Sequence, residues 1–156
     1  MSDYSAMPDH GVMSDHYEHK QVGTLMVAVL CLGAAAAGTA AFMNPSAGRW
    51  VGLAIAFGCV ALAWLFSSLT VIVDGNELQW FFGPGAWRYR MPRADIANVS
   101  IVRNSVLNGF GIRMRPGFRL YNVSGLDAVE LHLKNGEVRR IGTDDASGLA
   151  AALRGE

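Results

Sequence analysis

Two uncharged apolar runs near the start of the chain, Val22–Met43 and Trp50–Ser68, constrain its fold most strongly. Each is about as long as a helix must be to cross a bilayer core of ~30 Å. Neither contains Asp, Glu, Lys, Arg or His, whereas a soluble helix of that length would carry a polar stripe. Only Asn44–Arg49 separates them. The sequence therefore predicts a transmembrane helical hairpin over residues 22–68, with helices 22–43 and 50–68.

The segments that flank the runs suggest how the hairpin is oriented. Residues 1–21 are polar and acidic with few apolar side chains, so we expect a disordered N-terminal tail and no cleavable signal peptide. Lys20 precedes the first run and Arg88 follows the second, whereas the intervening loop carries only Arg49. Basic residues are enriched in cytoplasmic flanks. Both termini are therefore expected on the cytoplasmic side.

Small residues are frequent in both runs at spacings that let helix backbones approach closely in lipid. Two interpretations remain open: the hairpin closes on itself, or it packs against helices of another protein or a second copy. Cys31 and Cys59 lie inside the runs and are expected to pack there rather than form a disulfide or bind metal. The helix-packing candidates are Gly33, Ala37, Gly38, Gly52, Ala56 and Gly58.

The pattern changes from helix to strand after Ser68. Leu69–Asp74 alternates β-branched residues, and Asn135-Gly136 is typical of a two-residue hairpin turn. Near the end, Thr143-Asp144-Asp145 predicts the start of a helix over residues 144–154. We therefore expect residues 69–156 to form a small mostly-β domain of about seven antiparallel strands, closed by the C-terminal helix.

This arrangement resembles the bacterial PH-like membrane proteins, in which two transmembrane helices carry a pleckstrin-homology-type domain. The resemblance covers about residues 22–154 and implies a multi-pass protein of the bacterial inner (cytoplasmic) membrane. Phosphoinositide binding does not carry over, because the first strand–strand loop, Asp74-Gly75-Asn76-Glu77, is acidic and tight. The segments that carry the resemblance are Leu69–Val73, Phe82–Trp87, Met91–Val99, Gly109–Arg113, Leu120–Gly125 and Arg140–Asp145.

No catalytic, cofactor-binding or metal-binding set stands out. The predicted domain contains one histidine, His132, which alternates with leucines on a strand. A hydrolase or transferase using His132 with Asp127 or Glu130 is the alternative to a surface histidine. In the tail, His16 and His19 could form a metal pair only if that segment were helical, and a solvated tail is favoured.

Basic and apolar residues gather in the middle of the domain. Residues 88–119 contain seven arginines and one aspartate. The candidates for contact with anionic lipid are Arg88, Arg90, Arg113, Arg115 and Arg119. The segment Asn104–Phe118 sets apolar side chains among Gly and Asn, which favours contact with a partner. The partner-binding candidates are Val106, Leu107, Phe110, Ile112 and Met114.

These features predict a non-enzymatic membrane-anchored adaptor or accessory subunit that binds a membrane-protein partner, or a second copy, at the cytoplasmic surface. The alternative is a module that binds an anionic lipid surface by itself. Nucleic acid is not an expected partner, because from Asp74 onward 11 basic residues meet 9 acidic ones.

Overall fold

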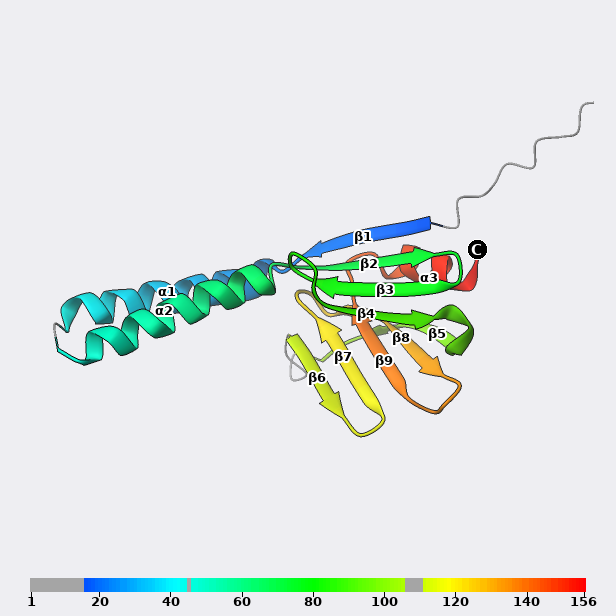
Figure 1. Ribbon diagram of the computed structural model, residues 1–156. Coiled ribbons are helices and arrows are strands. Elements are labelled where there is room, and N and C mark those ends of the chain that lie inside the picture. The colour runs from blue at the N-terminus through cyan, green and yellow to red at the C-terminus, as the bar shows by residue number, and fades with distance from the viewer. Residues whose placement is uncertain (1–15, 45, 106–110) are drawn as a thin grey trace, which may run out of the picture.

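The computed structural model describes residues 16–44, 46–105 and 111–156. Two helices lie side by side and project as a rod from one end of a β-rich domain (Figure 1). The domain consists of two sheets and a C-terminal helix, with nine strands among the described residues. The expected combination of two long apolar helices and a mostly-β domain with a C-terminal helix is confirmed.

The two helices of the rod are α1 (Thr24–Met43) and α2 (Gly48–Leu65). Both are long and apolar enough to cross a membrane. Apolar side chains point away from the pair along its length, and Leu32 is 72% exposed. The hydroxyl of Thr39 donates to the Ala35 carbonyl at 2.9 Å, so this polar group is satisfied within the helix.

The first sheet contains four antiparallel strands in the order β1-β2-β3-β4. Alternate side chains on its inner face fill the core, among them the buried Leu78, Trp80 and Phe82 of β3. Its strands are β1 (His16–Val22), β2 (Ser68–Asp74), β3 (Glu77–Phe82) and β4 (Ala86–Pro92).

Strand β1 corrects the expected disordered tail at residues 16–21. It pairs with β2 along its whole length, from His16 opposite Asp74 to Val22 opposite Ser68. The reason is non-local: β2 presents an open edge of backbone N–H and C=O groups, and a polar segment can satisfy them. The chain therefore contributes a strand to the domain before α1 begins.

The second sheet has the order β5-β8-β9-β7-β6. Its β7–β9 pair is parallel, which corrects the expectation of a wholly antiparallel domain. The β6–β7 hairpin precedes β8 in the chain but joins the free edge of β9, where β7 runs in the same direction as β9. The strands are β5 (Ile96–Arg103), β6 (Gly111–Arg115), β7 (Phe118–Asn122), β8 (Asp127–Leu133) and β9 (Val138–Gly142).

The two inner faces pack into one core, which α3 (Ala146–Arg154) closes with its buried Leu149 and Leu153. At its start, the Asp145 carboxylate accepts a hydrogen bond from the Gly148 N–H at 2.9 Å. The expected C-terminal helix is present, two residues shorter at its start than the predicted range.

Candidate functional site

The hairpin joins the domain directly. The Gly23 N–H, just before α1, donates to the Ser67 carbonyl, just after α2, at 2.8 Å. A Cβ at Gly23 would lie only 2.5 Å from the Phe66 carbonyl oxygen, so no side chain fits there. Because β1 and β2 pair where the helices end, the two chain segments are tied together at this joint.

The β3–β4 turn abuts the same joint. The Gly83 N–H donates to the Ser68 carbonyl at 2.8 Å, and a Cβ at Gly83 would lie 2.5 Å from the Leu65 carbonyl oxygen. The Phe66 ring contacts both Phe82, at 5.3 Å between centroids, and Trp87, at 5.7 Å. An aromatic cluster therefore joins the end of α2 to the turn.

Trp87 has an unusual backbone conformation. It is the non-glycine residue with a positive φ, +48°, among those described. Trp80 pairs with Tyr89 and Phe82 with Ala86, so Trp87 and Arg88 together oppose Phe81 in a β-bulge. This backbone region costs a residue with a side chain roughly 1–2 kcal/mol. The sequence gives no local signal for the bulge, because Ala86–Met91 has the composition of an ordinary strand.

Arg88 and Arg90 share the outer face of β4, as the strand period predicts. The Arg88 guanidinium carbon lies 4.6 Å from the centroid of the Phe81 ring, a cation–π contact. Arg90 stands opposite Gln79. Both arginines are exposed at the edge of the first sheet.

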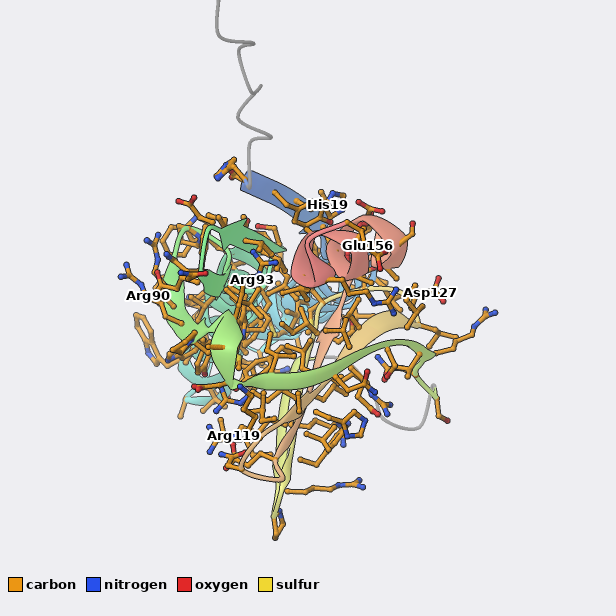
Figure 2. The ribbon with its side chains drawn as sticks, turned by 90° about the vertical axis from the view of Figure 1, so that its right-hand side faces the viewer. His19, Arg90, Arg93, Arg119, Asp127 and Glu156 are labelled. Atoms are coloured by element: carbon orange, nitrogen blue, oxygen red, sulfur yellow. The ribbon has the colours of Figure 1, made fainter. Side chains whose placement is uncertain are left out.

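The other candidate arginines belong to the second sheet. Arg113 and Arg115 are exposed on β6, an edge strand, and share one face. Arg119 on β7 stands opposite Met114, so it lies on the other face, and its guanidinium is 3.9 Å from Glu137. Figure 2 shows Arg90 and Arg119 well apart on the domain. The structure thus distributes the five arginines over separate strands and faces.

The apolar candidates divide between core and surface. Ile112 packs against the core, whereas Met114 is 62% exposed. A Cβ at Gly111 would lie 3.8 Å from Cε of Met26 in α1, so β6 begins beside the hairpin. The remaining candidates, Val106, Leu107 and Phe110, lie outside the described residues.

His132 belongs to an ion-paired network. Its Nε2 lies 3.0 Å from Oε1 of Glu130, whose other oxygen accepts two hydrogen bonds from Arg140. Arg140 also donates to Oδ1 of Asn104 at 2.9 Å. Burial raises the pKa of Glu130, but Arg140 and His132 outweigh this effect, so the pKa lies below its ordinary value. A carboxylate stabilised in this way is a poor general base. Through Arg140, the network also holds the buried side chain of Asn104 in place.

The glycines of the hairpin fall into two groups. A Cβ at Gly52 would lie 2.7 Å from the Cβ of Ala41 and 2.9 Å from the Ala37 carbonyl oxygen, so the helices approach closely there. A Cβ at Gly38 or Gly58 would have no described atom of the other helix within 4 Å.

Gly33 is intermediate in how closely the other helix approaches it, because a Cβ at this position would lie 3.5 Å from Sγ of Cys59. Both cysteines are free in the structure. Ala56, the last packing candidate, lies in α2 and is partly buried.

Strand β1 is fastened to the start of α3. The Tyr17 hydroxyl donates to Oδ2 of Asp145 at 3.1 Å, and Nε2 of His19 lies 2.5 Å from Oδ1 of Asp144. Burial and the hydrogen bond to Asp145 raise the pKa of Tyr17. The hydrogen bond from the Gly148 N–H, despite some burial, lowers the pKa of Asp145. Among the described residues, no group of three or more His, Cys, Asp and Glu could hold a metal ion.

A cavity of about 340 Å³ opens between the end of β4 and the β8–β9 turn, on the side of the domain away from the helices. Arg90, Asp95, Lys134 and Arg139 line it. The Nε of Arg139 is buried without a hydrogen-bond partner among the described residues, although its Nη2 donates to Oε2 of Glu137 at 3.3 Å. The cavity is basic, and its position separates it from the surface beside the hairpin.

The candidate site is therefore the surface at the joint, made of the start of β6, the β3–β4 turn and the ends of the helices. A scan against protein-family models finds none that matches the chain, and a search of curated proteins finds no match either.

Proposed function

We propose that this chain is a non-enzymatic adaptor or accessory subunit anchored in the bacterial inner membrane. In this proposal α1 and α2 cross the bilayer, and a PH-like domain on the cytoplasmic side binds a membrane-protein partner. The PH-like assignment is supported by two packed sheets closed by a C-terminal helix. Strand β1, which precedes α1, is an addition to the expected plan.

The observation that carries the proposal is the direct joint between hairpin and domain. Two residues, Phe66 and Ser67, connect α2 to β2, and the Gly23–Ser67 hydrogen bond closes the joint on the other side. A domain held in this way keeps a fixed face toward the bilayer surface. A fixed orientation favours binding to a neighbouring membrane protein, which is itself oriented in the bilayer. Binding of a freely diffusing substrate does not require a fixed orientation.

The orientation follows from basic residues at the domain end. Lys20 in β1 and the exposed arginines of β4 and β6 lie on the domain side, whereas Arg49 lies near the far tip of the hairpin. The positive-inside rule then supports a cytoplasmic domain.

The partner surface is assigned to the β6 edge because Met114 is exposed there and β6 begins beside α1, near Met26. To test it, the tagged full-length protein is purified in mild detergent and co-purifying proteins are identified by mass spectrometry. We expect Met114→Asp to reduce recovery of a membrane-protein partner at least fivefold. Burying a carboxylate at an apolar contact costs its desolvation.

The matched control is Ile101→Asp on β5. Ile101 is 53% exposed on the opposite edge strand of the same sheet, so its substitution by Asp introduces the same negative charge away from the β6 edge. Equal partner recovery from wild type and Met114→Asp, with both folded, would contradict the assignment.

The second candidate function, binding of anionic lipid, is favoured by the exposed pair Arg113 and Arg115. Each cation near such a surface contributes ~1 kcal/mol. It predicts that amide exchange in β6 slows in anionic nanodiscs compared with neutral ones, and that high salt removes the difference. The adaptor proposal predicts no dependence on lipid charge.

A further inference from the structure

The β-bulge at Trp87 changes the direction in which its side chain points. In an uninterrupted strand it would share the inner face of β4 with Tyr89, two residues later. The bulge opposite Phe81 changes the register and turns Trp87 away from the core, leaving it 51% exposed. Bulges commonly re-aim one side chain in this way, and the first bulge position with positive φ usually holds glycine. A large aromatic residue at this position therefore carries a backbone cost that its other interactions have to offset.

The direction in which Trp87 points is toward the joint with the hairpin. Its ring contacts Phe66, the residue that ends α2, at 5.7 Å. The glycine at the start of the turn, Gly83, packs against the carbonyls of Trp64 and Leu65 in the last turn of α2. The turn that carries Trp87 thus lies at the level where α2 ends.

This level coincides with the expected edge of the bilayer. The 18 residues of α2 span about 27 Å, and the hydrocarbon core is about 30 Å thick. If the core begins near Gly48, its other boundary falls just beyond Leu65, where Phe66 and Trp87 meet. Tryptophan is enriched at this depth, and Trp50 marks the other end of α2.

The adjacent charge fits the same environment. Arg88 follows Trp87, is exposed, and has its guanidinium over the Phe81 ring. An arginine beside the headgroups and a tryptophan at the hydrocarbon boundary are what an interfacial contact requires.

We propose that the β3–β4 turn docks into the interfacial layer of the bilayer through Trp87, and so fixes the orientation of the domain on the membrane. The inference rests on the proposed function in one respect, that α1 and α2 cross the bilayer. The partner is the lipid interface around the chain's own anchor.

The test measures depth in the full-length protein with Cys31→Ala and Cys59→Ala, reconstituted in phosphatidylcholine–phosphatidylglycerol nanodiscs. A nitroxide is attached at Pro84→Cys, an exposed position in the turn, or at Lys134→Cys in the β8–β9 turn as a control. Accessibility to oxygen, which favours lipid, is compared with accessibility to a water-soluble nickel chelate. We expect the oxygen-to-nickel ratio at Pro84→Cys to exceed that at Lys134→Cys at least threefold.

Trp87→Gly then separates docking from folding. Glycine suits the positive φ of the bulge, and this gain offsets the lost ring contact with Phe66, so the melting temperature in detergent should change little, while the ratio at Pro84→Cys falls toward the control value. A fall in melting temperature with an unchanged ratio would overturn the inference and assign Trp87 a packing role. Equal ratios at the two reporter positions with Trp87 intact would also overturn it.

A reporter at Leu32→Cys in α1 distinguishes the two proposals. If Leu32→Cys is accessible to oxygen and protected from nickel while Pro84→Cys is not, the docking inference fails and the anchor stands. If Leu32→Cys is itself accessible to nickel, the transmembrane proposal fails.

Discussion

At the scale of single residues, Glu130 has the clearest energetic role outside the core. It pairs with both Arg140 and His132, and its side chain is only 14% exposed. We expect Glu130→Gln to lower the free energy of unfolding by about 2 kcal/mol, because Arg140 would stay largely buried without its charged partner. Chemical denaturation in detergent, followed by circular dichroism, measures this loss.

The control for Glu130→Gln is Glu137→Gln. The Glu137 carboxylate is more exposed than that of Glu130, and its Oε2 lies 3.3 Å from Nη2 of Arg139. It should cost at most about 1 kcal/mol. Equal losses in the two variants would show that Glu130 has no special role.

The same residue gives a pH dependence with a defined sign. The pKa of Glu130 is lower in the folded protein than its ordinary value, so the folded state favours the ionised form. Its stabilisation is complete above about pH 5 and is lost as the pH falls through the lowered pKa. The stability difference between wild type and Glu130→Gln should therefore shrink below about pH 4. A difference that stays constant from pH 6 to pH 3 would contradict this assignment.

At the scale of elements, local patterns predicted most of the fold. The apolar runs, the alternation in Leu69–Asp74 and the Asn135-Gly136 turn are signals contained within a few residues, and the structure has elements at each of them. The parallel β7–β9 pair and strand β1 depend on partners far along the chain, so no local pattern encodes them. For the site, the exposed arginines were predictable from charge, but their separation over two sheets was not.

Strand β1 provides the prediction at this scale. Tyr17→Ala removes both the packing of its ring on the core and its hydrogen bond to Asp145. We expect a loss of about 1–2 kcal/mol and faster amide exchange in β2, whose edge β1 covers. His16→Ala, on the opposite face of the same strand, should leave both quantities nearly unchanged. If Tyr17→Ala left exchange in β2 as slow as in wild type, β1 would not be the element that protects this edge.

At the scale of the whole molecule, the hairpin has to close on itself and also present a face to its surroundings, and different glycines serve these two needs. Gly52 lies where the helices touch, close to Ala37 and Ala41, whereas Gly38 and Gly58 have open space beside them among the described residues. In lipid such close contacts stabilise helix pairs by packing, since apolar burial offers no advantage there.

Substituting leucine at each position separates the two uses. Gly52→Leu forces the helices apart and should lower the melting temperature in detergent by several degrees, whereas Gly58→Leu should leave it unchanged because its added side chain meets only lipid or detergent. If the open face of the hairpin docks against a partner's helices, Gly58→Leu should also reduce partner recovery in the co-purification experiment. A stable Gly58→Leu protein that keeps its partner would assign docking to the β6 edge alone. A Gly52→Leu protein as stable as wild type would contradict the close contact between α1 and α2 at Gly52.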